Sequence, residues 1–353
     1  MRVHILGGGI IGASIAYHLT RTPGIEVQVF EKDRLLSQSS FARSCGGLRS
    51  QYSTATNIQM SRYSIDFIKN IPGLKFTGNG YLMLFGADQA QDCRSSFRLQ
   101  KKHGASTRCL RPDQLKTLHD YLNVDDVWRG CQTFDQSEGW IDPTTLHSWF
   151  VTEARAAGAN WNWLDGLQAD HDHADAIVLA SGCWTGQVGR HFGLDIPVAG
   201  HKHTVFHVSS PAQHIPSLPV VADLITGIYI RPEGNQYIVG YDGNGTWSAP
   251  DLEPDLQSWD RVWELLYHRF PGIFEAARCQ GAWSGYYDSS TIDNNAIIDK
   301  RGNIYFATGF TGRGLMHSPA VGHQVSLMIQ DQPTLDLSAY ELNRKPDIEK
   351  YVI

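Results

Sequence analysis

The first thirty residues alternate between short apolar runs and one longer apolar segment that follows a cluster of glycines. Residues 3–6 form a short β-branched run, and residues 27–30 form a second one. Between them, residues 13–19 have the small and apolar side chains of a buried helix. A strand, a helix and a strand in this order predict a βαβ unit, whose two strands lie parallel in one sheet.

Apolar patterns further along the chain predict more strands of this sheet and a second domain. Residues 175–180 form a continuous apolar run that ends in small residues, as is typical of a central parallel strand. Strands are also predicted at 205–208, 227–230, 237–241 and 303–308, and helices at 57–68, 94–103, 144–157, 257–270 and 318–329. We predict an α/β (α+β) fold, in which a Rossmann-like domain with a parallel sheet is joined by a second domain with a mixed or antiparallel sheet.

A glycine-rich turn joins the first predicted strand to the first predicted helix. Its sequence, Gly7-Gly8-Gly9-Ile10-Ile11-Gly12, matches the pattern G-x-G-x-x-G in the strand–turn–helix context that the motif requires. Gly7 permits the tight turn, Gly9 lets the main chain approach a pyrophosphate, and Gly12 lets the helix pack closely on the strand. We therefore expect residues 7–12, with Ile10 and Ile11 among them, to bind a diphosphate at the helix N-terminus.

An acidic residue lies where the second predicted strand ends. Glu31 is placed to accept hydrogen bonds from an adenosine ribose, and Lys32 directly follows it. The fingerprint does not distinguish NAD from FAD. Because no second G-x-G-x-x-G follows downstream, a reductase that passes electrons from a nicotinamide to a bound flavin is not expected. If the nucleotide is FAD, reducing equivalents must come from an organic substrate.

Composition limits the class of protein further. At about 150 residues per domain, 353 residues predict about two domains, and the 42% hydrophobic content argues against disorder. A net charge of −6 lacks the excess of basic residues that nucleic-acid binding requires, so nucleic acid is not an expected partner. No apolar run is long enough for a membrane span. The six cysteines form no C-x-x-C motif, so zinc and thioredoxin-type chemistry have no support, and we expect free thiols in a cytoplasmic protein.

Several segments together resemble one family of flavoproteins. They are GGGIIGASIAYHL with Glu31, SSFARSCGGLRSQYS, GWIDP, ADAIVLASGCW, GIYIRPEGNQYIVG, GAWSGYYDSSTIDNNAIID and NIYFATGFTGRGLMHSPAVG. In sequence and order they resemble the D-amino-acid oxidase superfamily of FAD-dependent oxidoreductases, in the branch that includes sarcosine oxidase and dimethylglycine dehydrogenase. The segment GAWSGYYDSSTIDNN most resembles a branch associated with mitochondrial complex I and its bacterial relatives.

The resemblance implies a discontinuous FAD-binding domain and assigns its cofactor-binding residues. This domain is expected to comprise residues 1–65, 136–200 and 298–353, and the substrate domain residues 66–135 and 201–297. Residues implied to contact the flavin, its ribityl chain or the rest of FAD are Ser39, Ser40, Ser44, Gly46, Gly47, Gly182, Trp184, Gly312, Arg313, Gly314 and Leu315. Because Ser44 falls at the attachment His of the dehydrogenases and Tyr286 near the attachment Cys of the oxidases, we expect non-covalent FAD.

The resemblance also implies where substrate binds. The candidate catalytic and substrate-binding residues are Arg49, Tyr229, Asp242, Arg313 and Tyr287, with Tyr286 as the alternative to Tyr287. Arg49 could hold a carboxylate with two hydrogen bonds, or it could pair with the flavin. We expect only one of Tyr229 and Arg231 to face the flavin. Asp242 would favour a cationic amine, although a turn aspartate before Gly243 is an equal possibility.

The function implied is oxidation of the C–N bond of a small amine or N-substituted amino acid, by hydride transfer to flavin N5. Either oxygen or an electron-acceptor partner would reoxidise the flavin, and Ile238 stands where the oxidases keep an oxygen-activating Lys. The alternatives are a 2-hydroxy-acid dehydrogenase of the same superfamily and a non-catalytic FAD-binding assembly factor. His201, His203 and His207 share one strand face, but without a carboxylate or Cys at ligand spacing we expect no metal. The exact substrate and the oligomeric state stay open.

Overall fold

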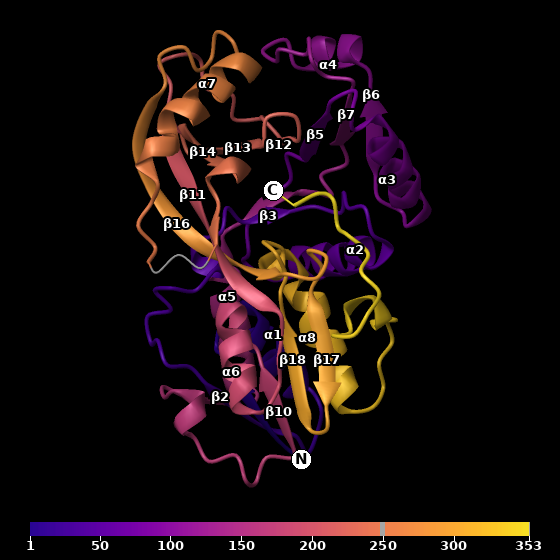
Figure 1. Ribbon diagram of the computed structural model, residues 1–353, viewed down its shortest axis with the longest axis vertical. Coiled ribbons are helices and arrows are strands. Elements are labelled where there is room, and N and C mark those ends of the chain that lie inside the picture. Colours follow the sequence, from indigo (N-terminus) through magenta and orange to yellow (C-terminus); the bar gives the residue numbers. More distant parts are fainter. Residues whose placement is uncertain (248–250, 353) are drawn as a thin grey trace.

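Two large sheets organise the computed structural model, which describes residues 1–247 and 251–352. Residue 353 of the predicted FAD-binding domain and residues 248–250 of the predicted substrate domain lie outside the described residues. Figure 1 shows two lobes stacked along the long axis, with one sheet in each.

The sheet of the lower lobe has six strands in the order β17-β18-β10-β1-β2-β9. Their bounds are β1 Arg2–Leu6, β2 Glu26–Phe30, β9 Asn160–Asn162, β10 Ala176–Leu179, β17 Ile297–Arg301 and β18 Ile304–Thr308. Neighbouring strands are parallel, except that β17 is antiparallel to β18. The carboxyl ends of β1, β2, β10 and β18 therefore meet at one edge of this sheet.

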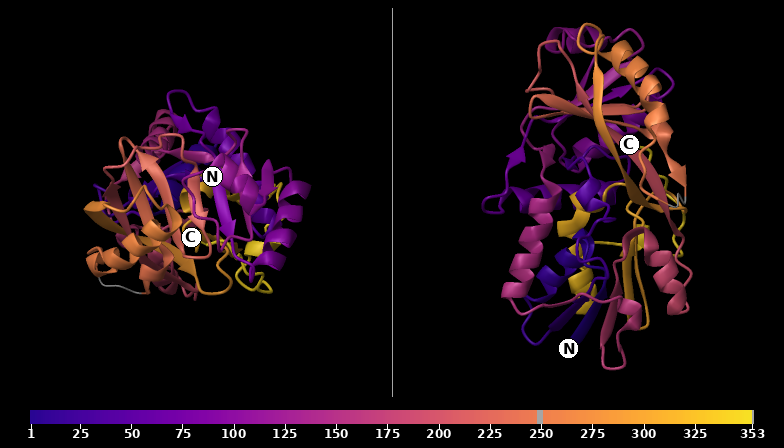
Figure 2. Two further views of the ribbon diagram at one scale, coloured as in Figure 1. Left: turned by 90° about the horizontal axis from the view of Figure 1, so that it is seen from above. Right: turned by 90° about the vertical axis from the view of Figure 1, so that its left-hand side faces the viewer.

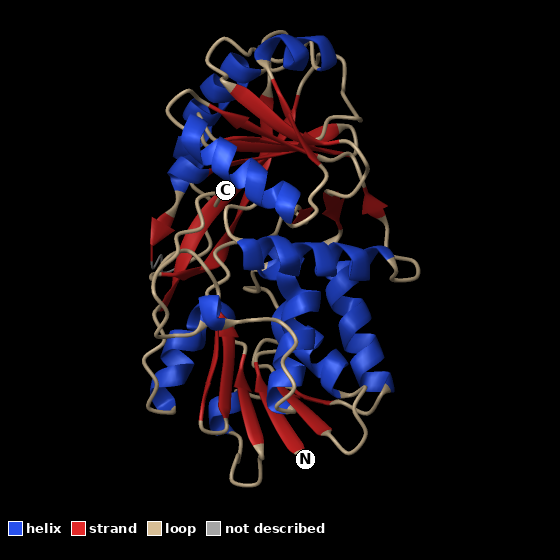
Figure 3. Ribbon diagram, turned by 90° about the vertical axis from the view of Figure 1, so that its right-hand side faces the viewer, coloured by secondary structure: helices blue, strands red, loops and turns tan. Residues whose placement is uncertain are grey.

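Helices cover both faces of the six-stranded sheet. On one face α1 (Ile10–Leu19) packs against α5 (Pro143–Ala156) and α8 (Gly314–Ile329), and α2 (Ala55–Lys69) crosses α8. Val3 and Ile5 of β1 point to this face, whereas Leu6 points to the other, which α6 (Thr185–His191) covers. Figure 2 shows α5 and α6 on opposite sides of the sheet, and Figure 3 shows the helices of the first face in blue.

The sheet of the upper lobe is mixed and has nine strands. Eight follow the order β15-β11-β14-β13-β12-β5-β7-β6, and β16 pairs with β11. Their bounds are β5 Tyr81–Phe85, β6 Thr107–Leu110, β7 Arg129–Thr133, β11 Val198–Ser209, β12 Val220–Asp223, β13 Ile228–Glu233, β14 Gln236–Tyr241, β15 Thr246–Trp247 and β16 Arg278–Ser290. Only β5 and β12 among these pairs are parallel. In Figure 1 the two long strands β11 and β16 run from the upper lobe toward the lower one.

Three helices and a small sheet complete the fold. The helices are α3 (Ala90–Lys102), α4 (Pro112–Leu118) and α7 (Trp259–Arg269), and apolar residues of α4 and α7 pack in one core with the upper sheet. The small sheet joins β3 (Gly47–Leu48), β8 (Gly139–Ile141) and β4 (Phe76–Thr77). Among the described residues, no helix combines the length and the apolar character that crossing a membrane requires.

The predicted fold class is confirmed, but several elements differ in extent. Helix α8 begins at Gly314, four residues before the predicted start, although Pro319 lies inside it. The hydroxyl of Ser318 donates to the Leu315 carbonyl at 2.8 Å, the carbonyl that Pro319 cannot reach because it has no N–H. Strand β16 is not predicted from the sequence, because apolar and polar residues do not alternate regularly along it. Pairing with β11 along nearly the whole of both strands stabilises it instead.

Candidate active site

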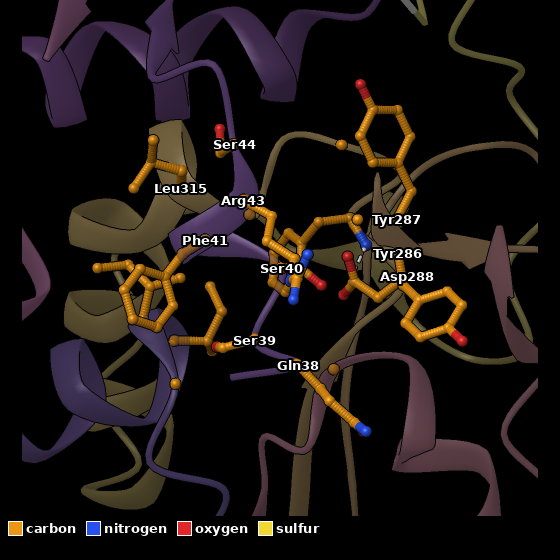
Figure 4. A pocket seen from close by; sticks show the side chains of 18 of the residues that line it. Gln38, Ser39, Ser40, Phe41, Arg43, Ser44, Tyr286, Tyr287, Asp288 and Leu315 are labelled. Carbon is orange, nitrogen blue, oxygen red and sulfur yellow. Dashed lines mark hydrogen bonds between the residues drawn. The ribbon is translucent and has the colours of Figure 1, made fainter. Parts of the chain in front are cut away.

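A cavity of about 630 Å³ lies between the two lobes. It begins at the carboxyl ends of β1, β2, β10 and β18 and reaches residues of β11, β13 and β16 in the upper sheet. Figure 4 shows residues 38–44 and Leu315 on one side of it and residues 286–288 on the other. In an open α/β sheet, this edge is where ligands bind.

The glycine motif forms one end of the cavity. Gly7 has φ +111°, and a Cβ there would lie 2.4 Å from the Ala180 carbonyl oxygen, so this turn requires glycine. Gly9 differs, because a Cβ added to it would meet nothing nearer than Ser39 Oγ at 3.5 Å and would project into open space. Gly9 is also the N-cap of α1, and no side chain caps this helix. The N–H groups of its first turn are therefore available to an anion.

The predicted ribose-binding side chain lies at the same end. Glu31 accepts hydrogen bonds from the backbone N–H of Gly8 and from that of Asp33, each at 2.8 Å. These bonds fix the carboxylate at the carboxyl end of β2 while each oxygen keeps a further lone pair. The Lys32 ammonium lies 5.5 Å from the ring centre of Trp184, and both residues line the cavity.

The serine-rich loop forms the middle of the cavity with residues that follow β10. Ser39, Ser40, Ser44 and Gly47 line it. From the other side Gly182 lines it with φ +56°, and a Cβ there would meet no protein atom within 4 Å. Main chain and small side chains therefore face a long, open space on both sides.

The N-terminus of α8 forms another end of the cavity, which we name the α8 end. Gly312 has φ +82°, and a Cβ there would lie 2.8 Å from the Tyr287 ring. Arg313 is the N-cap of α8, and no side chain caps the first turn, to which Gly314 and Leu315 belong. These N–H groups and the helix dipole stabilise negative charge in front of them.

Two tyrosines of the upper sheet line the α8 end. Tyr229 Oη accepts from the Cys45 thiol at 3.7 Å, and Tyr287 stacks obliquely on His203 with ring centres 4.3 Å apart. Burial raises the pKa of both phenols, so both keep their protons at neutral pH. Arg231 lines the cavity as well as Tyr229. The expectation that only one of them faces it is wrong, because residues two apart lie on the same face of a strand.

The two predicted arginines line the cavity but already have partners. Arg49 is 5% exposed and donates from Nη1 to the Gln51 carbonyl at 2.7 Å and from Nη2 to the Tyr351 carbonyl. Its guanidinium carbon lies 4.3 Å from the ring centre of Tyr52. Arg313 is 2% exposed and donates to the Asn294 carbonyl.

Three predicted site residues are not among those that line the cavity. Asp242 is exposed in a short 3-10 turn after β14. Gly12 and Gly46 contact the protein backbone instead of the cavity. A Cβ at Gly12 would lie 1.9 Å from the Gly7 oxygen, and a Cβ at Gly46 would lie 2.1 Å from the Ile141 oxygen. Close backbone packing therefore explains both glycines.

Sequence reasoning did not single out two residues that line the cavity. Burial raises the pKa of Asp288 to about 6, although its carboxylate accepts from the Phe310 N–H at 3.3 Å. Burial, and then the neighbouring His201, lower the pKa of His203 to about 3. Asp288 belongs to the GAWSGYYDSST segment already quoted, so a closer look at that motif could have found it. His203 was weighed only as a metal ligand.

The residues present fit FAD. An open groove over Gly9 leads to an uncapped helix N-terminus, which suits the pyrophosphate, and Glu31 beside it suits the adenosine ribose. The second uncapped N-terminus, that of α8, suits the end of the flavin on which negative charge develops when it is reduced.

Comparison with known proteins agrees with this geometry. The family model "FAD dependent oxidoreductase" matches residues 2–328. FAD-dependent oxidoreductase domain-containing protein 1 of Xenopus laevis is 30% identical over 99% of this chain and 84% of its own. The 4-methylaminobutanoate oxidase (formaldehyde-forming) of Paenarthrobacter nicotinovorans is 24% identical over 98% of this chain and 45% of its own. The crystal structure of L-proline dehydrogenase from P. horikoshii superimposes with a TM-score of 0.85 at 24% identity, over 96% of both chains. The chain therefore belongs to the FAD-dependent oxidoreductase family, and FAD is the cofactor that this membership implies.

Proposed function

We propose that the protein oxidises the C–N bond of a small amine or amino acid, and that a secondary amine is its preferred substrate. The observation that carries this proposal is the uncharged wall formed by Tyr229, Tyr287 and His203 at the α8 end of the cavity. With the tyrosine pKa values raised and that of His203 lowered to about 3, all three groups are neutral at physiological pH.

A neutral, largely desolvated wall favours the free amine over the ammonium ion, because burial disfavours the charged form of a bound group. Only the free amine has the nitrogen lone pair that assists loss of hydride from the neighbouring carbon. Bound FAD supplies the acceptor for that hydride. The chain in turn provides the uncapped N-terminus of α8, which stabilises the negative charge that arrives, and the upper sheet, which keeps bulk water away from the reacting carbon.

Oxidation of a 2-hydroxy acid fits this wall less well. An alcohol must lose its hydroxyl proton as the hydride leaves, so it needs a general base nearby. Within this wall, a histidine whose pKa is about 3 is a weak base, and two protonated phenols are not bases at neutral pH. Asp288 also lines the cavity with a pKa of about 6, but it does not belong to this wall, and its carboxylate accepts a hydrogen bond from the Phe310 N–H.

The relatives support an amine as the substrate. The names of the Paenarthrobacter and P. horikoshii proteins give them a secondary amine as substrate, 4-methylaminobutanoate in one case and L-proline in the other. Both molecules also carry a carboxylate, but the number of bonds between the carboxylate and the nitrogen differs between the two. The shared feature that we transfer to this chain is the secondary nitrogen alone.

Anaerobic reduction of the bound flavin tests the proposal. The panel comprises N-methyl amino acids, L-proline, primary amino acids and 2-hydroxy acids, and the readout is loss of flavin absorbance. We expect secondary amines to bleach the flavin fastest and the rate to rise with pH as the substrate nitrogen loses its proton. A panel in which only 2-hydroxy acids bleach it would support the dehydrogenase alternative. If no compound bleaches it, the catalytic proposal is wrong and a non-catalytic role is favoured. Oxygen added afterwards distinguishes an oxidase from a dehydrogenase.

A further inference from the structure

Three cysteines that lie far apart in the sequence meet at one point of the upper lobe. They are Cys93 on α3, Cys109 on β6 and Cys131 on β7, and we name them the thiol triad. Their sulfur atoms all lie within 4.8 Å of one another, and Cys93 Sγ is 3.6 Å from Cys131 Sγ. Figure 1 shows α3, β6 and β7 side by side at the outer edge of the upper sheet. The triad is not part of the cofactor cavity.

The surroundings of the triad are apolar. Cys93 and Cys131 are buried, whereas Cys109 is partly exposed and faces Cys131 directly across the strand pair. Met83 and Phe85 pack against the two buried cysteines. Tyr351 belongs to the same cluster, and its buried hydroxyl has no hydrogen-bond partner in the described part of the chain. Of the three thiols, Cys109 is therefore the one that solvent can reach.

We propose that the thiol triad binds one thiophilic metal ion, Zn²⁺ or Cu⁺, through all three sulfurs. Sulfur atoms that each lie about 2.3 Å from one ion are roughly 4 Å from one another, which matches their spacing here. Thiolate ligands select these soft ions over Mg²⁺ or Ca²⁺. On binding, the thiol protons go to solvent, three metal–sulfur bonds form, and no oxidation or reduction takes place. The ion ties α3 to the outer edge of the upper sheet.

The competing reading is a disulfide between two of the three thiols. It leaves the third cysteine without a role, whereas a metal uses all three. The sequence offered no support for zinc, because the known zinc-binding motifs have ligands close together in sequence. Here each of three separate elements contributes one ligand.

Metal titration of the intact FAD-containing protein tests the proposal. The protein is reduced with a phosphine, dialysed free of metal and titrated with Co²⁺ as a spectroscopic stand-in for Zn²⁺, and separately with Cu⁺ in competition with a coloured chelator. We expect one equivalent to bind, with thiolate-to-cobalt absorption in the first experiment. The variants Cys93→Ser, Cys109→Ser and Cys131→Ser should weaken binding by more than the ~10–100-fold that loss of an outer-shell partner costs. The variant Cys279→Ser is the matched control, because Cys279 is partly exposed on β16 and should leave the titration unchanged.

A second measurement needs no variant and so does not depend on how the substituted proteins fold. Alkylation of the wild-type protein followed by mass spectrometry should show Cys109 protected about tenfold or more when Zn²⁺ or Cu⁺ is present, and Cys279 modified at an unchanged rate. Binding that survives in all three triad variants, or alkylation of Cys109 that no metal slows, would overturn the proposal. So would a Cys93–Cys131 or Cys109–Cys131 disulfide in protein that binds no metal after reduction. Loss of flavin-reducing activity would concern the proposed function and not this site.

Discussion

Replacing Gly9 with Ala should strengthen the apoprotein and weaken FAD binding at the same time. Gly9 has φ −66° and ψ −173°, an extended conformation that alanine adopts without strain. A Cβ there meets only Ser39 Oγ, at 3.5 Å, so the protein itself accommodates the methyl group. Because alanine restricts the unfolded chain, the free energy of unfolding of the apoprotein should rise by about 0.4–1 kcal/mol.

The same methyl group occupies the space in which the pyrophosphate would contact the first turn of α1. A hydrogen bond to a charged group contributes about 1.5–3 kcal/mol. If the methyl group breaks one such bond, FAD binding should weaken about 10- to 150-fold. The assays are urea unfolding of the apoprotein and titration of the apoprotein with FAD, followed by quenching of flavin fluorescence.

Two further glycines calibrate this experiment. At Gly281, in β16, φ lies outside the left-handed region and a Cβ meets no atom within 4 Å, so Gly281→Ala should leave FAD affinity unchanged. Gly7→Ala should lower both stability and FAD affinity, since its Cβ lies 2.4 Å from the Ala180 oxygen at φ +111°. The reasoning fails if Gly9→Ala binds FAD as tightly as Gly281→Ala does, or if it destabilises the apoprotein as Gly7→Ala does.

Three more predictions concern single carboxylates. Glu31→Gln should weaken FAD binding about tenfold in the same titration, because an amide has one acceptor oxygen where the carboxylate has two; an unchanged affinity would place the ribose elsewhere. The pKa of Asp288 rises from 3.8 to about 6 on folding, so the folded state binds the extra proton and stability falls as pH rises from about 4 to 6. Asp288→Asn should remove about 2 kcal/mol of that fall between pH 4 and pH 7, measured by urea unfolding of both apoproteins at these two pH values; parallel pH curves would contradict it. Asp223→Ala should lower the free energy of unfolding by about 3–5 kcal/mol without changing FAD affinity, because it leaves the fully buried Arg269, 2.7 Å away, with the partly exposed Asp126 as its acidic partner and the Asn123 carbonyl as an uncharged one; a loss under about 1 kcal/mol would show that Asp126 suffices.

Local sequence was sufficient wherever the function depends on the backbone of one short segment. The turn at residues 7–12 could be predicted because Gly7, Gly9 and Gly12 are spaced by the geometry of a single strand–turn–helix unit, and Glu31 directly follows the next strand of that unit. The same holds for residues 312–315, which follow the short turn after β18 and lead into α8. In both segments the feature that matters is a row of main-chain N–H groups, and glycines mark it in the sequence.

Sequence was insufficient wherever a side chain depends on partners far along the chain. The family resemblance placed Asp242 at the substrate, with a turn aspartate as the alternative, and the turn that follows β14 carries it to the surface. The thiol triad shows the opposite error, since no spacing reveals that α3 delivers Cys93 to the strand pair of Cys109 and Cys131. Strand β16 was missed for the same reason. Its pairing with the distant strand β11 makes it a strand, and its own sequence pattern does not.

The arginines show how such distant contacts change the chemistry assigned to a motif. Arg49 follows the serine-rich loop and was expected to hold a substrate carboxylate, but both of its terminal nitrogens donate to backbone carbonyls, one of them that of Tyr351. The segment around Tyr351 is itself fixed, since the buried Glu349 carboxylate accepts hydrogen bonds from Ser53 and from other residues at the start of α2. Arg313 lowers the pKa of that same carboxylate. Both cations that line the cavity near α8 thus also hold the chain's own final segment in place. Recognition of a substrate then rests more on the neutral wall than on a charged clamp, and for this reason we place the specificity of the site in the state of the substrate nitrogen.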